Sequence, residues 1–296
     1  MPRKTPPVCS YEGSDYQESF WGKGNRAYED AVESVALKRL LPVSGKWMLE
    51  LGAGAGRNTP RYQGFERVVL LDYSTTQLAQ AQARLGKSPR YRYVAADIYH
   101  LPFIDGLFDA ATMIRTLHHM ADAPAALSQV RHVLQTKSTF ILEFANKRNL
   151  KSVARYLLGR QKWNPFSPEP VEFEKLNFDF HPKTIRKWLR ELDFKIQKSL
   201  AVSHFRMGWL KRHIPINLLV GADSFLQWSG SWCQYTPSVF VKSLLTSQKP
   251  AAKPGTFFKC PKCDSTKLIE TPSKIICSEC KTNYPISDGI YDFRLM

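Results

Sequence analysis

The sequence predicts an α/β fold, in which a mostly parallel sheet is covered by helices on both faces, followed by a small C-terminal module. Up to residue 245, short apolar runs rich in Val, Ile and Leu alternate with segments of helical periodicity. A polar stretch with two prolines and no periodicity covers residues 246–256 and is typical of a linker. Four of the six cysteines follow it. We therefore expect one large domain over residues 1–245, a linker over 246–256 and a module over 257–296.

The apolar runs predict seven strands, and polar and apolar residues at helical spacing predict the helices between them. The expected strands cover residues 47–51, 67–72, 92–97, 108–115, 139–145, 194–203 and 237–245. The expected helices cover residues 25–41, 75–85, 124–134 and 181–192, with a further helix beginning at Asn58. Ligands of open α/β sheets bind beyond the carboxyl ends of the strands, so the chemistry is expected in the loops that follow them.

The charge of the chain is strongly positive. Lys and Arg number 42 against 26 Asp and Glu, which gives +16, and residues 148–245 hold 16 basic and 7 acidic side chains, or +9. Such a field favours RNA or another polyanion, or an anionic membrane surface, although net charge also serves solubility. No apolar run is long enough to span a membrane and no signal core begins the chain, so a cytoplasmic enzyme is expected.

A glycine-rich loop follows the first expected strand and predicts a cofactor site. It contains Glu50, Gly52, Gly54 and Gly56. Glycines permit a tight turn and let a ligand approach the backbone. The dinucleotide fingerprint G-x-G-x-x-G would require glycine at position 57, where Arg57 stands. The spacing therefore disfavours a dinucleotide-binding loop.

Later strand ends carry further candidate ligands. The second strand ends in Asp72, whose carboxylate can accept two ribose hydroxyls, and the third ends in Asp97 followed by apolar Ile98. The fourth strand runs to Arg115.

Taken together, residues 47–145 resemble the type 11 group of class I S-adenosylmethionine-dependent methyltransferases, which includes ubiquinone and menaquinone methyltransferases. The resemblance implies a seven-stranded Rossmann-like sheet with S-adenosylmethionine bound at this edge. It places the glycine loop at the methionine end of the cofactor, Asp72 at the ribose, and Asp97 with Ile98 at the adenine; we include Arg115 among the cofactor ligands. The Pro-Gly-Gly turn usual in the group is replaced by residues 136–138, Thr-Lys-Ser.

Three polar residues are candidates for catalysis. His118 and His119 follow the fourth strand at the expected edge, and a neutral imidazole there can accept a proton from the methyl acceptor. Adjacent residues on an extended chain point to opposite sides, so at most one of them should face the site. Asn146, after the fifth strand, is the analogous candidate.

Residues 148–235 match no motif and are expected to shape the acceptor site as a lid. They mix Phe, Trp and His with Arg and Lys. Such a mixture can stack bases and grip phosphates, can lie on lipid, or can simply pack on the sheet.

The four clustered cysteines predict a zinc ribbon. Cys260, Cys263, Cys277 and Cys280 form two C-x-x-C pairs separated by thirteen residues, which allows a hairpin to bring both pairs around one Zn²⁺. The tail over residues 284–290 resembles the small zinc-binding activator subunit of eukaryotic tRNA, rRNA and release-factor methyltransferases. The resemblance implies that a module of this kind, here fused, stabilises the enzyme or presents its substrate.

Three hypotheses follow for the function. The first is a methyltransferase acting on RNA or a translation protein, favoured by the basic segment and the ribbon. The second is a small-molecule or quinone-type methyltransferase, and the third is a catalytically silent scaffold that binds the cofactor or a partner.

Overall fold

The computed structural model describes residues 6–14, 17–22, 26–248, 252 and 255–295. Part of the linker expected over 246–256, and the first residue of the helix expected over 25–41, lie outside these ranges. Among the described residues, no helix is both long and apolar enough to cross a membrane.

The described residues form thirteen strands and seven α-helices. The strands are β1 Gly45–Leu51, β2 Phe65–Asp72, β3 Tyr91–Ala95, β4 Phe108–Met113, β5 Leu134–Ala145, β6 Val171–Glu174, β7 Asn177–Asp179, β8 Phe194–Val202, β9 Ser238–Leu245, β10 Leu268–Glu270, β11 Lys274–Cys277, β12 Asn283–Ser287 and β13 Ile290–Asp292. The helices are α1 Ala27–Leu40, α2 Thr75–Leu85, α3 Ala123–Val133, α4 Leu150–Leu157, α5 Pro182–Glu191, α6 Gly208–His213 and α7 Ile216–Leu226.

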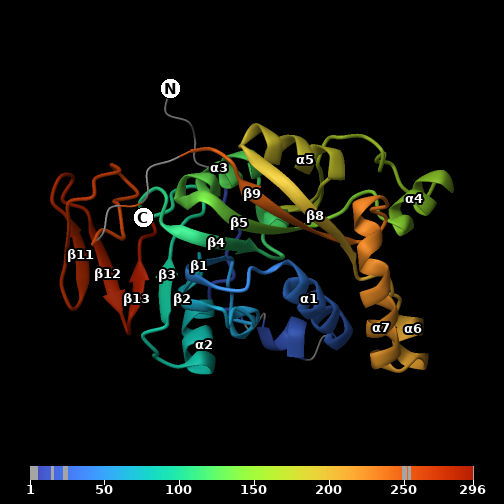
Figure 1. Cartoon of the computed structure of the whole chain (residues 1–296), viewed down its shortest axis with the longest axis horizontal. Helices are drawn as coiled ribbons and strands as arrows, with labels where there is room; N and C mark the ends of the chain where they lie inside the picture. The colour runs from blue at the N-terminus through green and yellow to red at the C-terminus, as the bar shows by residue number, and fades with distance from the viewer. Residues whose placement is uncertain (1–5, 15–16, 23–25, 249–251, 253–254, 296) are drawn as a thin grey trace.

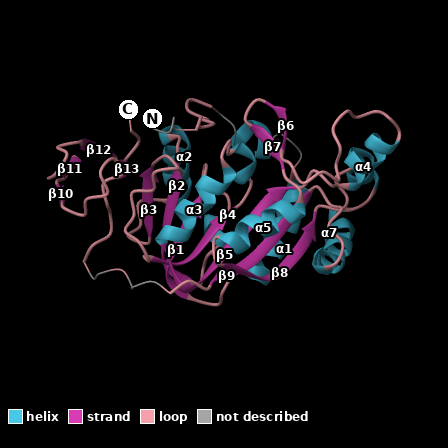
Figure 2. Cartoon of the chain, turned by 90° about the horizontal axis from the view of Figure 1, so that it is seen from above, coloured by secondary structure: helices cyan, strands magenta, loops and turns pink. Residues whose placement is uncertain are grey.

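The expected seven-stranded sheet is confirmed, with the order β3-β2-β1-β4-β5-β9-β8. Strands β1 to β5 are parallel, and β9 pairs antiparallel with both β5 and β8. Helices α3 and α5 lie on one face, and α1 and α2 lie on the other (Figures 1 and 2). Alternate residues of β1 serve the two faces: Leu49 and Leu51 pack with α3, whereas Met48 packs with α2.

The C-terminal module continues this sheet. Strand β13 pairs in parallel with β3, through Ile290 with Tyr93 and Asp292 with Ala95. Strands β12, β11 and β10 follow in order, so one sheet of eleven strands runs through both parts of the chain (Figure 1). The hairpin expected within the ribbon is present as β10 and β11.

Aromatic side chains also join the ribbon to the large domain. The Phe258 ring stacks on Phe103 with centroids 5.9 Å apart, and Phe257 contacts Trp47 at 4.8 Å. Phe258, Cys260 and Cys277 belong to the same hydrophobic cluster as Leu49. The domain limits stay a prediction, but the two units expected from the sequence share a sheet and a core.

Two local expectations differ from the structure. Asn58 is followed only by a single 3₁₀ turn over Thr59–Arg61, in which Arg61 forms a salt bridge with Asp30. In the turn that lacks the usual glycines, Lys137 has φ of +62° inside β5, a conformation that glycine adopts more easily.

Candidate functional site

A small cavity lies at the carboxyl ends of β1, β2 and β4, where the sequence places the cofactor loops. Its volume is about 110 Å³. Its lining comprises Val8, Cys9, Tyr11, Gly52, Gly54, Leu71, Asp72, Tyr73, Gln77, Ala96, Ile98, Arg115, Thr116, His119 and Met120. Five expected cofactor residues and one histidine are thus brought together.

The glycine loop bends back through residues in the left-handed region. Gly52 has φ of +67°, and a Cβ atom there would lie 2.2 Å from the Thr116 Oγ1 atom. Only glycine fits that position without displacing the Thr116 side chain. Gly54 has φ of +53° and donates its N–H to Asp72 Oδ2 at 2.8 Å. The loop therefore closes against the end of β2.

Asp72 is the central polar group of this edge. Its Oδ1 atom accepts the N–H of Ser74 at 2.9 Å, while Oδ2 accepts that of Gly54. Burial raises the pKa of the Asp72 carboxyl, and the two backbone N–H groups oppose that shift. The Tyr73 N–H also bonds this carboxylate, so one of its roughly four lone-pair sites remains for a ligand hydroxyl.

Three expected cofactor residues do not border the cavity. Glu50 is buried and accepts a hydrogen bond from Thr59 Oγ1 at 2.6 Å, and burial raises its pKa to about 7. Gly56 is buried too, and a Cβ atom there would meet Leu85. The Asp97 carboxylate caps its own turn, accepting the N–H of Tyr99 at 2.9 Å.

His119 faces the cavity in a defined tautomer. Its Nδ1 atom lies 3.2 Å from the Leu176 carbonyl oxygen, which only accepts, so Nδ1 carries the proton. The Nε2 atom then accepts from the Tyr11 hydroxyl at 3.1 Å. Burial lowers the pKa of His119, while its bond to Leu176 opposes this shift, and the ring is neutral at neutral pH.

The other two catalytic candidates lie elsewhere. The His118 ring packs on His119 with centroids 3.9 Å apart and does not border the cavity. Asn146 is buried and donates to the carbonyl oxygens of Gln234 and Thr236, at 2.9 and 2.8 Å. Asn146 therefore ties β5 to the segment before β9.

The N-terminal segment is the part of this site that the sequence does not reveal. Val8, Cys9 and Tyr11 cover the cavity, although nothing in their proline-rich surroundings signals a ligand site. The cavity is smaller than the roughly 300 Å³ at the lower end of ligand pockets. The glycine loop, Asp72 and Ile98 fit a nucleoside cofactor in their chemistry, whereas the volume of the cavity as it stands is smaller than such a ligand fills.

A second, larger cavity lies beside the first and has a volume of about 1480 Å³. It is formed almost wholly by the segment expected to act as a lid, and its lining includes Leu150, Arg155, Trp163, Phe173, His204, Arg206, Met207, Leu226 and Tyr235. Arg206 also lies close to His118. Burial, His119, Arg115 and Arg206 together hold the pKa of His118 well below its usual value. The two cavities thus approach each other at these histidines.

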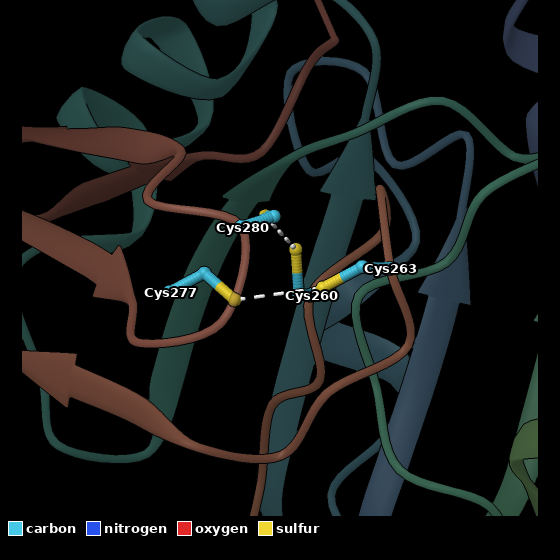
Figure 3. A group of neighbouring side chains, drawn as sticks. All are labelled: Cys260, Cys263, Cys277 and Cys280. Carbon is cyan, nitrogen blue, oxygen red and sulfur yellow. Dashed lines mark hydrogen bonds between the residues drawn. The ribbon is translucent and has the colours of Figure 1, made fainter.

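The four clustered cysteines converge at the junction of the ribbon with β3 (Figure 3). Their Sγ atoms all lie within 4.8 Å of one another, with Cys260 to Cys280 and Cys263 to Cys277 both at 3.6 Å. A tetrahedral zinc ion with bonds of about 2.3 Å separates its thiolates by about 3.8 Å. The donor set and spacing therefore fit Zn²⁺.

The comparisons with known proteins agree with this architecture. Residues 49–142 match the family described as "Methyltransferase domain". The chain is 32% identical over 109 residues to the O-methyltransferase cnsE of Penicillium expansum, covering 35% of this chain and 40% of that protein. It is 30% identical over 165 residues to a demethylmenaquinone methyltransferase of Chlamydia trachomatis, covering 54% of this chain and 70% of that enzyme.

Solved structures show the same fold at lower identity. One is a chain of the complex between the Haloferax volcanii Trm112 methyltransferase activator and a candidate methyltransferase, with TM-score 0.56, 15% identity, and coverage of 78% of this chain and 96% of that chain. Another is an S-adenosylmethionine-dependent methyltransferase from Mesorhizobium loti, with TM-score 0.53, 20% identity, and coverage of 74% and 100%. The chain belongs to the family of S-adenosylmethionine-dependent methyltransferases.

Proposed function

We propose that this chain transfers the methyl group of S-adenosylmethionine to an acceptor held in the larger cavity. The observation that carries this proposal is the joining of Gly52, Gly54 and Asp72 in one pocket beside that cavity. When bound, the cofactor supplies a methyl group already activated by its sulfonium. The chain then has to position the acceptor and exclude water.

His119 and Tyr11 are the groups placed to handle a proton. Neutral His119 holds its Nε2 lone pair toward the cavity, where it now accepts from the Tyr11 hydroxyl. An acceptor hydroxyl that displaced Tyr11 would meet the same lone pair and lose its proton to it. Arg115, fixed by its Nε hydrogen bond to Glu33 at 2.7 Å, adds positive charge at the edge of the pocket.

The acceptor that the geometry favours is a small apolar molecule. Trp163, Phe173, Leu226 and Tyr235 line the larger cavity, so it can enclose an apolar ring or chain. Relatives named demethylmenaquinone methyltransferases support the same class.

RNA or a translation protein remains the second candidate acceptor. The +9 of residues 148–245 favours it, as does the fold shared with a chain of the Trm112 activator complex.

The ribbon's proposed role is structural. Cys260, Cys263, Cys277 and Cys280 would hold one Zn²⁺ and so fix the four short strands that extend the sheet beyond β3. The ion would thereby stabilise the edge of the sheet next to the cofactor pocket.

The proposed activity is tested by incubating the full chain with S-adenosylmethionine labelled in its methyl group and separate fractions of lipid extract, RNA and protein. Label in the lipid fraction supports the apolar acceptor, and label in RNA or protein supports the second candidate. Cofactor binding without any transfer would instead favour a silent scaffold.

A further inference from the structure

Exposed apolar side chains gather at the end of the molecule opposite the ribbon. Of the seventeen large hydrophobic side chains that are exposed among the described residues, fourteen lie between residues 150 and 235. Most come from α4, α6, α7 and the turns beside them, whereas Phe173 lies on β6; α4 and α7 stand at the same end of the molecule in Figures 1 and 2. We call residues 150–163 and 207–235 the apolar face.

Helix α7 shows how incompletely this face is covered. It is apolar along most of its length, yet only Leu219 and Asp223 are buried. Phe225 is 80% exposed, and Trp232, which follows in the next turn, is 87% exposed. Contiguous exposed patches of this kind mark sites of interaction with a protein or a membrane.

The charges of this face have one sign. Lys151, Arg155, Arg160 and Lys162 surround the exposed leucines of α4, and residues 147–168 contain no acidic residue. Within residues 205–235 the one acidic residue is Asp223, which is buried and accepts from Tyr28 and His204. The nearest exposed acids of the sequence lie on and before strand β6.

We propose that the apolar face docks on a bilayer containing anionic phospholipids. Aromatic and aliphatic side chains would enter the interface, while Arg and Lys contact the headgroups, which is the arrangement found in helices that lie on membranes. A second copy of this chain is a poor occupant, because it would bring one basic face against another. The charge therefore favours an anionic partner.

The larger cavity opens onto this face. Leu150, Arg155, Met207, Leu226 and Tyr235 belong to both. A docked molecule would thus present the proposed acceptor cavity to the lipid, and an apolar acceptor could enter without crossing water. Docking itself does not require methyl transfer, so its failure is distinguishable from failure of the proposed function.

The test is flotation of the full chain with vesicles of phosphatidylcholine alone or mixed with phosphatidylserine. We expect binding to the mixed vesicles and weak binding to the neutral ones. Phe225→Ser with Trp232→Ser, and separately Arg155→Glu with Arg160→Glu, should each weaken binding about tenfold or more. All four side chains are exposed, so the fold should persist, which circular dichroism checks.

Matched controls lie outside the face. Ile269→Ser on β10 and the pair Lys87→Glu with Lys274→Glu change exposed residues of the same kinds and should leave vesicle binding intact. The proposal is overturned if the native chain ignores anionic vesicles, or if the control and face variants weaken binding equally. Binding to RNA instead, lost in the arginine pair alone, would overturn it in favour of RNA. A dimer broken by the Phe225 and Trp232 changes would overturn it in favour of self-association.

Discussion

The Tyr11 hydroxyl lies 3.1 Å from Nε2 of His119, although 108 residues separate the two in sequence. The rings also meet edge to face, with centroids 5.6 Å apart. This contact brings the N-terminal segment onto the edge of the sheet, where Tyr11 and His119 line the smaller cavity. It also occupies the Nε2 lone pair of a neutral histidine in the wall of the smaller cavity.

The first prediction concerns His119. If it removes the acceptor proton, His119→Ala should lower kcat by about 10²- to 10⁴-fold while cofactor affinity changes little. Because burial lowers the pKa of His119 from its usual 6.5, the native rate should stay constant above pH 6.5 and fall only at lower pH, where the ring becomes protonated. Tyr11→Phe keeps the ring contact and removes only the hydroxyl bonded to Nε2, so it separates the contribution of that hydroxyl from that of the imidazole. Undiminished turnover in His119→Ala would remove the base from the mechanism.

The cysteine cluster gives a second prediction. Cys277→Ser should lose the single zinc ion found by metal analysis, because it removes one of four thiolate ligands. Cys233→Ser is the control, as Cys233 is exposed and lies outside the cluster. Cofactor binding should survive Cys277→Ser at least in part. Full zinc content in that variant would exclude this ligand set.

The shared sheet predicts that the ribbon and the large domain unfold together. Phe258 is 7% exposed and packs on Phe103 and Phe293, so Phe258→Ala should lower the free energy of unfolding by about 3 to 5 kcal/mol. Calorimetry of the native chain should show one transition, which moves to lower temperature when a chelator removes zinc. Two separate transitions would show that the two parts fold independently.

Glu50 predicts a dependence of stability on pH. Its pKa rises from 4.5 to about 7 on folding because the side chain is buried. The folded state therefore holds the Glu50 proton more tightly, and the resulting stability is present below pH 4.5 and is lost as the pH rises through 7. The Glu50→Gln variant should not lose this stability as the pH rises, because glutamine does not ionise.

Urea titrations at pH 5 and pH 8 measure this effect. At each pH, the free energy of unfolding of the native chain is subtracted from that of Glu50→Gln. This difference should be larger at pH 8 than at pH 5 by on the order of 2 to 3 kcal/mol. Asp179, whose pKa is raised to about 6 by desolvation, and the other acids are common to both proteins, so the difference isolates Glu50. If the variant and the native chain differ in unfolding free energy by the same amount at pH 5 and pH 8, the pKa of Glu50 is not raised.

Local patterns predicted the elements whose residues carry strong periodicity or a spaced motif. The runs ending in Leu51 and Asp72 became adjacent parallel strands because alternate buried residues serve two helical layers. The cysteine pairs converged because their spacing fits a hairpin. These strands and cysteine pairs form from residues that are recognisable in the sequence by their apolar runs or their spacing.

Other features depend on tertiary contacts that no local pattern encodes. Tyr11 contacts His119 across 108 positions of the sequence, and the Asn146 amide donates to the carbonyl oxygens of Gln234 and Thr236. The joining of β13 to β3 rests on an exposed strand edge of the large domain. No periodicity or motif in the sequence predicts any of these pairings.

Cofactor binding at Asp72 tests the central claim most directly. Titration calorimetry of the full chain with S-adenosylmethionine should show binding of one molecule per chain. Asp72→Ala should weaken it by about 1 to 3 kcal/mol, or roughly 5- to 150-fold, because charge-assisted hydrogen bonds and the support of Gly54 are lost. Unchanged affinity in a folded Asp72→Ala protein, or no heat of binding from the native chain, would contradict the account.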